Sequence, residues 1–289
     1  MSWDTPQSIR IECDRLFREV LNDPNEAIIE GLNTSFGHES GTLVEKWTKS
    51  KLIKEEQLSE RVFFPDEFLT KVFTTIGKDE TKIEQFLEKT WWGFKFGKDR
   101  LLVTQKQIND FISGEKIERW QQEAGDIIVF YGNDLQADLN SILMVNVKSH
   151  NEARASRPPN IISAERLMKF FVSVFERQDF MEILDKTNYW FIGVGYRVQD
   201  GIAKAIRADI RDLFKLDLMK IPQINFDAAI QIQWHVRDMV EKSEQDKLLF
   251  IQDMMKTLVI QWGIHSDRKG KKYKAAMQTI NEKVDSRRD

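Results

Sequence analysis

The sequence has very little cysteine, no long apolar run and no strong excess of charge of one sign. Its single cysteine, Cys13, cannot form a disulfide within the chain, as is typical of proteins from a reducing compartment. No apolar stretch is long enough to span a bilayer, and the first residues show no basic segment followed by an apolar one. We therefore expect a cytoplasmic protein without a membrane segment or a signal peptide.

The charge balance excludes fewer classes of protein. The formal net charge is −3 over 289 residues, which argues weakly against a protein that coats nucleic acid passively. It does not exclude an enzyme that acts on DNA, because acidic surface elsewhere can cancel a locally basic cleft in the sum. The hydrophobic content of 41% and the charged content of 31% are typical of a globular protein.

The order of the predicted elements indicates a mixed α/β protein. Residues 1–95 are predicted to be mainly helical, residues 96–240 carry the predicted strands, and residues 241–289 are predicted to form C-terminal helices. No internal repeat, low-complexity tract or obvious linker interrupts the chain. We therefore expect a single domain over residues 1–289.

Within this order, several elements have defined limits. The pattern predicts a helix from 42 to about 56, where Thr42 and Glu45 fit a capping box. It also predicts a short strand at 101–103 and a helix from 163 to about 175.

The strongest local pattern is a pair of apolar stretches that predict two antiparallel strands, 124–130 and 141–148, joined by a polar segment. The centre of that segment sets Asp126 and Lys148 about opposite each other. Asn146 and Lys148 are two residues apart, so they point to the same face of a strand. A carboxylate, an amide and an ammonium group then converge among apolar neighbours.

This set of groups suits a divalent cation and a phosphodiester. A carboxylate oxygen can hold Mg²⁺, and a lysine can stabilise phosphate charge or help to activate water. An aspartate and a lysine at the ends of two apolar strands also arise by chance, and the alternative interpretation is surface charge at strand ends.

The pattern Asp126…Asn146-Val147-Lys148 resembles the Asp…(Asp/Glu)-x-Lys active site of the PD-(D/E)xK nucleases, with Asn146 as the departure. Further segments, in the same order along the chain, resemble the HincII-like type II restriction endonucleases. They are Gly37-His38-Glu39-Ser40-Gly41-Thr42-Leu43-Val44-Glu45-Lys46, Pro159-Asn160-Ile161-Ile162-Ser163-Ala164 and Gln231-Ile232-Gln233-Trp234-His235-Val236-Arg237-Asp238. The resemblance implies a PD-(D/E)xK restriction-endonuclease-like core with a mixed sheet flanked by helices, a helical N-terminal part and C-terminal helices.

The resemblance also implies roles for the residues of the hairpin. Asp126 is the first metal carboxylate, Asn146 stands at the second acidic position, and Lys148 is the catalytic lysine. The carbonyl of Val147 is a further metal ligand, and Glu45 is a candidate for outer-shell metal or water binding. An exposed glutamate of a helix cap is the alternative interpretation of Glu45. Mg²⁺ is the implied cofactor, and Mn²⁺ can substitute for it.

Asn146 predicts a weakened site. Asparagine offers a neutral oxygen where hard cations prefer a carboxylate, so the affinity for Mg²⁺ should fall. Either the natural enzyme uses asparagine, or an aspartate was exchanged to trap uncleaved DNA. We favour the exchange, because it changes a single functional group at the one position where it would have this effect. We expect low activity of the chain as written.

The candidate DNA-contacting residues lie in two stretches. They are Arg154, Arg157 and Asn160 after the catalytic strand, and Gln223, Asn225 and Asp227 further along the chain. By the resemblance, the first stretch contacts base edges at the centre of the site and the second contacts the outer pairs. Arginine commonly pairs with guanine, asparagine with adenine, and aspartate accepts from cytosine. The alternative for each residue is a solvated loop position.

The expected function is Mg²⁺-dependent hydrolysis of phosphodiester bonds at a specific short palindromic site in double-stranded DNA. A palindromic site needs a two-fold symmetric protein, so we expect a homodimer. The resemblance implies a bacterial or archaeal cell that also holds a cognate DNA methyltransferase. The alternatives are a structure-specific repair nuclease and a DNA-binding protein of nuclease descent that has lost catalysis, which Asn146 supports.

Overall fold

The computed structural model describes residues 5–33, 37–120, 124–153, 157–221, 223–226, 230–243, 246–263 and 267–286. The chain divides into two compact units, which are Met1–Arg157 with Lys186–Ile210, and Pro158–Asp185 with Arg211–Asp289. Each unit has its own sheet and its own helices. The expectation of a single domain over residues 1–289 stays a prediction.

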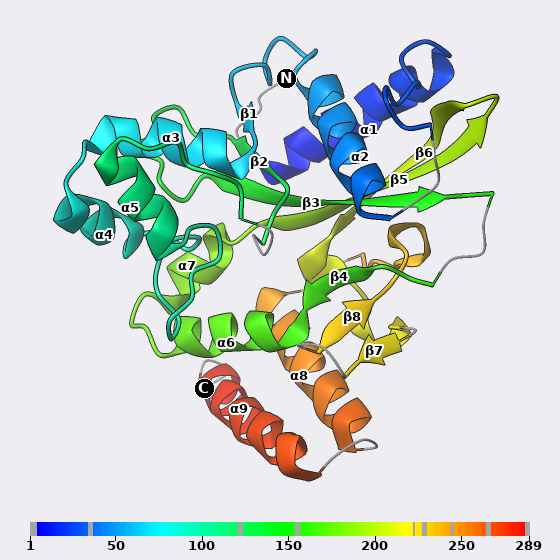
Figure 1. The fold of residues 1–289 in the computed structure, drawn as a ribbon. Coiled ribbons are helices and arrows are strands. Elements are labelled where there is room, and N and C mark those ends of the chain that lie inside the picture. Colours follow the sequence, from blue (N-terminus) through cyan, green and yellow to red (C-terminus); the bar gives the residue numbers. More distant parts are fainter. Residues whose placement is uncertain are drawn as a thin grey trace. The chain divides into compact units, whose positions relative to one another are not determined.

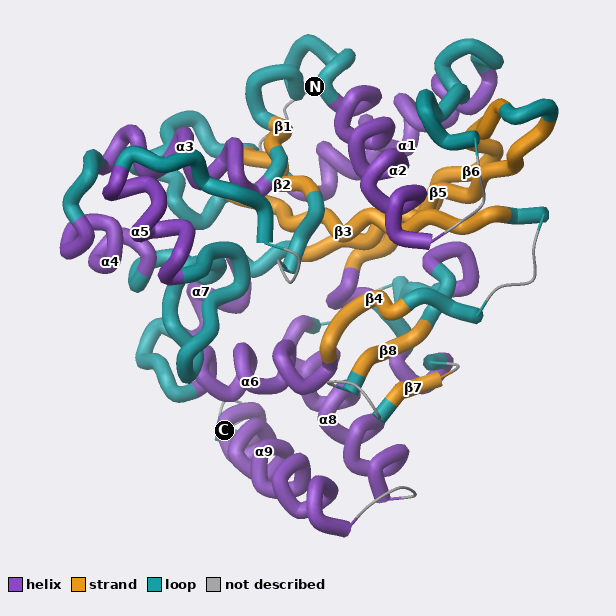
Figure 2. The backbone as a smooth tube through the Cα atoms, in the orientation of Figure 1, coloured by secondary structure: helices purple, strands orange, loops and turns teal. Residues whose placement is uncertain are grey.

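The first unit is built on a mixed sheet. Its helices are α1 (Pro6–Asn22), α2 (Gly37–Leu52), α3 (Pro65–Ile76), α4 (Glu80–Leu87) and α5 (Gln105–Ser113). Its strands lie in the order β1 (Val62–Phe63), β2 (Ile127–Phe130), β3 (Ile142–Asn151), β5 (Tyr189–Gln199) and β6 (Ile202–Asp212), as Figure 1 shows. Strand β2 runs antiparallel to β3, and β3 runs parallel to β5. Figure 2 shows these strands in orange among purple helices, which confirms the predicted mixed α/β fold.

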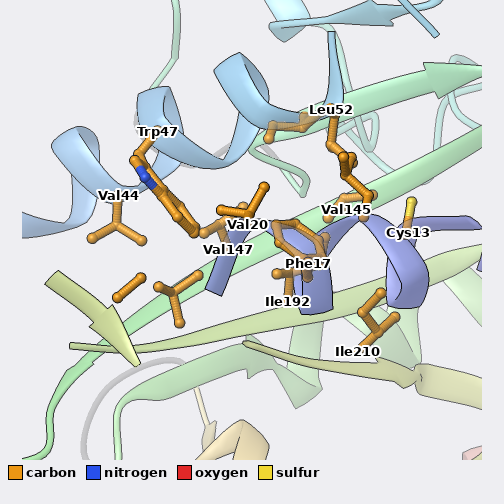
Figure 3. Close-up of a cluster of buried hydrophobic side chains, with 14 of the residues drawn as sticks. Cys13, Phe17, Val20, Val44, Trp47, Leu52, Val145, Val147, Ile192 and Ile210 are labelled. Atoms are coloured by element: carbon orange, nitrogen blue, oxygen red, sulfur yellow. The ribbon is translucent and has the colours of Figure 1, made fainter. Parts of the chain in front are cut away.

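Helices α1 and α2 cover one face of β3 and β5 with apolar side chains. Phe17 and Trp47 stack with ring centroids 6.2 Å apart, and they lie in one buried cluster with Val145, Val147 and Ile192. Figure 3 shows these side chains meeting between the helices and the strands. Because side chains alternate along a strand, burial of Val145 and Val147 on this face turns their neighbours on β3 to the other face.

The register of the hairpin corrects one expectation. Ile127 pairs with Val145, and this register, continued beyond the end of β2, sets Asp126 level with Asn146 rather than with Lys148. The expected register assumed a symmetric connection between the strands. In the structure, aspartate carboxylates of that connection accept backbone N–H bonds and fold it into turns, which shifts its centre.

Local patterns misplaced two further elements. Helix α2 begins at Gly37 and ends at Leu52, so Thr42 and Glu45 lie inside the helix and form no capping box at its start. The apolar residues at 101–103 are buried without forming a strand, and Thr104 then caps α5. At 101–103, burial of the apolar side chains against other elements decided the conformation, and the local pattern did not.

The second unit has a small sheet covered by helices. Its strands lie in the order β4 (Asn160–Ser163), β8 (Gln231–Gln233) and β7 (Gln223–Asn225). Its α-helices are α6 (Ala164–Phe175), α7 (Phe180–Lys186), α8 (Lys247–Gly263) and α9 (Asp267–Asp285), with 3-10 turns at Leu213–Lys215, Leu218–Lys220 and Val236–Asp238. Helix α6 confirms the helix predicted from 163 to about 175, with the Ser163 side chain as its cap, and α8 and α9 confirm the C-terminal helices.

Aromatic side chains build the core of the second unit. The Phe171 ring meets the Phe214 ring edge-on with centroids 6.1 Å apart, and Phe214 meets Phe250 in the same way at 5.3 Å. Among the helices of the described residues, none has both the length and the apolar character that crossing a membrane requires.

The buried stack on α1 makes a prediction about stability. Phe17→Ala should lower the free energy of unfolding by about 3–5 kcal/mol, because it leaves a cavity between α1 and the sheet. Ile11→Ala on the same helix is the control, since Ile11 is 50% exposed and should change stability by less than about 0.5 kcal/mol. Urea unfolding of both variants measures the difference. Similar losses in the two variants would contradict the packing described here.

Candidate functional site

The carboxylate of Asp126 is fixed at the point where β2 begins. Its Oδ2 atom accepts a hydrogen bond of 2.7 Å from the backbone N–H of Val147 on β3. In a strand, the N–H and the C=O of one residue point to the same edge, so the Val147 carbonyl faces the side on which Asp126 lies. The structure thereby brings together two of the metal-binding groups that the sequence predicted.

Asn146 lies between these groups and β5, and it is buried. Its Nδ2 atom donates to the hydroxyl of Tyr189 at 3.1 Å, and that hydroxyl donates to the carbonyl of Ala124. Its Oδ1 atom is buried and has no hydrogen-bond partner among the described residues. A buried oxygen without a partner costs about 1–3 kcal/mol, so this atom is suited to a ligand such as a cation or a bound water.

Lys148 follows Asn146 on the same face of β3, because the two residues are two positions apart. Its partner on the parallel strand β5 is Gly193, which carries no side chain beside it. The side chain is half-buried, so the ammonium group can meet a substrate from solvent. Asp126, Asn146, Val147 and Lys148 therefore lie at one place in the first unit.

Glu45 belongs to this group, through a residue that the sequence did not single out. Helix α2 runs alongside β3, and the Glu45 side chain is only 16% exposed. Nη1 of Arg119 lies 3.0 Å from Glu45 Oε2, and Nη2 of Arg119 lies 3.6 Å from Asp126 Oδ1. The interpretation of Glu45 as an exposed helix cap is therefore wrong.

The electrostatics of Glu45 show the same association. Burial raises the pKa of Glu45, and the negative charge of Asp126 raises it further. The positive charges of Arg119 and Lys148 act in the opposite direction on this pKa. The Glu45 carboxylate therefore interacts electrostatically with both the predicted metal carboxylate and the predicted catalytic lysine.

The donor atoms at the hairpin fit a hard cation. Within the described ranges, no set of three or more histidine, cysteine, aspartate or glutamate side chains could hold a metal ion. The site offers instead the carboxylates of Asp126 at the hairpin and Glu45 on α2, together with the orphaned amide oxygen of Asn146 and the peptide carbonyl of Val147. All of these are oxygen donors, which Mg²⁺ prefers to nitrogen or sulfur.

The second unit carries a row of amide side chains across its sheet. Asn160 on β4 pairs with Gln233 on β8, which in turn pairs with Gln223 on β7. The next row places Asn225 opposite Gln231. The isoleucines that alternate with these residues on β7 and β8 are buried, so one sheet face is apolar and the other carries amides.

The remaining predicted DNA-contacting residues are Arg157, Arg154 and Asp227. Arg157 is exposed. Arg154 and Asp227 lie outside the described residues. Gln231 and Gln233 were not predicted as contacts, although their alternation with buried isoleucine on a strand places them on the same face as Asn225.

Comparison with known proteins finds similarity to restriction endonucleases. A family model described as "Restriction endonuclease HincII" matches residues 30–277. The type II restriction enzyme HindII of Haemophilus influenzae strain Rd is 24% identical over 209 residues, which are 71% of this chain and 73% of that enzyme. The type II restriction enzyme HincII of Haemophilus influenzae is 25% identical with the same coverage. A solved chain of the NlaIV restriction endonuclease has a TM-score of 0.35 at 15% identity, covering 63% of this chain and 72% of that one.

The class that the family model and the two Haemophilus relatives define is that of the type II restriction endonucleases. Because the family model covers most of its length, the chain belongs to the HincII restriction endonuclease family. The resemblance seen in the sequence is thereby confirmed.

The hydrogen bonds of Tyr189 make a prediction about the site. Tyr189→Phe removes the acceptor for Asn146 Nδ2 and the donor to the Ala124 carbonyl, so it should lower the free energy of unfolding by about 1–3 kcal/mol. Tyr131→Phe is the matched control, because within the described part of the chain the Tyr131 hydroxyl takes part in one hydrogen bond, of 2.9 Å, from Asn188. Chemical denaturation of both variants measures the difference, and equal effects would count against the network.

Proposed function

We propose that this chain is a Mg²⁺-dependent endonuclease that hydrolyses phosphodiester bonds at a specific short palindromic site in double-stranded DNA. The observation that carries this proposal is the bond between the Asp126 carboxylate and the Val147 N–H, one residue before Lys148. This bond supports a site in which a metal carboxylate, a peptide carbonyl and an ammonium group would act together. Membership of a family of restriction endonucleases supports DNA as the substrate.

Asp126, Asn146 and the Val147 carbonyl would hold the cation. When bound, Mg²⁺ supplies Lewis-acid stabilisation of the scissile phosphate and lowers the pKa of a bound water. Lys148 places its ammonium group beside the phosphate, where it stabilises the negative charge that develops during attack and positions the water. The Val147 N–H holds the Asp126 carboxylate in one orientation, and its other oxygen, which lies 3.6 Å from Arg119 Nη2, would bind the cation.

Asn146 weakens the site without removing it. The orphaned Oδ1 atom can act as a neutral ligand, but it contributes no negative charge. A binding protein that has lost catalysis is the second candidate function, and the neutral side chain of Asn146 is the observation that favours it.

DNA recognition would combine both stretches of predicted contacts. Arg154, Arg157 and Asn160 would meet the central base pairs, and Gln223, Asn225 and Asp227 the outer ones. The amide face of the small sheet supports Asn160 most directly: its Oδ1 accepts from Gln233 Nε2 at 2.9 Å, which leaves its Nδ2 to donate to a base.

A palindromic DNA substrate also implies an oligomeric state for the enzyme. Two copies of the chain would form a homodimer whose two-fold axis coincides with that of the DNA site. Such an enzyme acts in the cytoplasm of a bacterial or archaeal cell, together with a cognate methyltransferase that protects the host DNA. Neither enzyme needs to hold the other in a stable complex.

Cleavage of plasmid DNA tests the proposed function. Asn146→Asp should raise the cleavage rate at least roughly tenfold in Mg²⁺, because it restores a hard-cation carboxylate. Lys148→Ala in the Asn146→Asp protein should abolish cleavage, whereas Lys116→Ala, an exposed lysine, should leave it intact. Sequencing of the fragment ends would give the recognition site.

The outcomes separate the candidate functions. Equal rates for the chain as written and the Asn146→Asp variant would refute the role of this position. Absence of cleavage by either protein in Mg²⁺ and in Mn²⁺, with a DNA affinity that does not depend on the cation, would favour the binding-only function.

The amide face makes a separate prediction about specificity. Asn160→Ala should weaken binding to the recognition site by about 1–3 kcal/mol, the contribution of one good base contact, with no change for unrelated DNA. Asn109→Ala, on the exposed face of α5, is the matched control. Fluorescence anisotropy in Ca²⁺ measures both affinities. An equal loss on specific and unrelated DNA would show that Asn160 contacts only the backbone.

A further inference from the structure

The neutral side chain of Asn146 raises the question of which group supplies the second negative charge of the cation site. Among the described residues, Glu45 is the carboxylate that shares a guanidinium with Asp126, since Arg119 lies against both. Glu45 on α2 and Asp126 before β2 are far apart in the sequence, so they become neighbours only when the chain folds. Only 16% of its side chain is exposed, so its charge is largely removed from water and depends on Arg119 for compensation.

Arg119 fixes the distance between the two carboxylates. A guanidinium is planar and presents its terminal nitrogens side by side, so two carboxylates held by these nitrogens converge. The Arg119 guanidinium also lies over the Phe64 ring, 5.1 Å from its centroid, and Nη2 is 3.5 Å from the Asp126 carbonyl. These contacts hold Arg119 between α2 and the start of β2.

The other cation near Phe64 does not compete for Glu45. Lys49, one helical turn after Glu45 on α2, lies 4.2 Å from the centroid of the same ring and pairs with Glu67. Its charge is therefore engaged by Glu67. Arg119 remains as the group that partners Glu45 in the metal-free protein.

We propose that Glu45 is a direct carboxylate ligand of the cation, in the role that Asn146 cannot fill, and that Arg119 is the positioning residue that holds it beside Asp126. This inference rests on the proposed function, since it concerns the same cation. Two carboxylates close together repel each other, and Arg119 relieves that repulsion until a divalent cation takes over the same task. The site then has two acidic ligands although its hairpin supplies one.

Cation binding without DNA tests the inference, with Mn²⁺ as the probe and isothermal titration calorimetry as the measurement. Glu45→Gln should weaken Mn²⁺ binding at least roughly tenfold in the chain as written, because it removes one of two carboxylate ligands. In the Asn146→Asp protein the same change should cost less than about threefold, since the hairpin then supplies its own second carboxylate. Glu56→Gln, an exposed carboxylate just beyond α2, is the control and should have no effect.

Arg119→Gln distinguishes positioning from simple charge. Removal of a nearby positive charge should by itself raise the affinity for a cation. If Arg119 holds Glu45 in place, the affinity falls instead, although a positive charge has gone. Far-UV circular dichroism of each variant verifies that it is folded, and a rise in affinity would overturn the positioning role.

The outcomes distinguish this inference from the proposed function. Equal losses from Glu45→Gln in both backgrounds, or no loss in either, would overturn the ligand role of Glu45 while Asn146→Asp still bound Mn²⁺ and cut DNA. If neither the chain as written nor Asn146→Asp bound Mn²⁺ or cut DNA, both the inference and the proposed nuclease function would fail.

Discussion

The hydrogen bond from the Val147 N–H to the Asp126 carboxylate is the interaction on which the arrangement of the site depends. It joins the residue that precedes β2 to the end of the buried part of β3, so that one carboxylate oxygen is held by the backbone and the other faces Arg119. It is possible because Val147 faces the apolar cluster under α1 and α2, which fixes the direction of β3. The apolar core on one face of the sheet thus determines which groups can bind a cation where β2 meets β3.

The fold was predictable from the sequence where patterning and turn chemistry agree. The hairpin strands, the capped helix α6 and the C-terminal helices follow from local patterns. Strand β6 was missed, because its alanines and charged residues favour helix, although Asp200-Gly201 before it is a typical hairpin turn and both residues have positive φ. The hairpin register and the start of α2 could not be predicted in this way, because they depend on contacts that no local pattern contains.

The residues of the candidate site also differ in whether the sequence alone could identify them. Asp126 and Lys148 could be found because they lie on adjacent strands of one hairpin, within reach of a spacing argument. Arg119 could not, because its role depends on a contact with Glu45 across 74 positions of sequence. The pairing of Asn160 with Gln233 depends in the same way on two strands far apart in the chain. Residues that act through partners distant in sequence need the fold before they can be recognised.

The neutral side chain of Asn146 changes the net charge of the whole site. Asp126 and Glu45 carry negative charge, Arg119 and Lys148 carry positive charge, and with asparagine these four cancel. An aspartate at position 146 would leave a net negative charge, which attracts a divalent cation from solution. It would also accept from the Tyr189 hydroxyl, which now donates to the Ala124 carbonyl, so the two acceptors would share one donor. The asparagine therefore donates to Tyr189 without disturbing its bond to Ala124 in the metal-free protein, whereas an aspartate would need a cation to balance its charge.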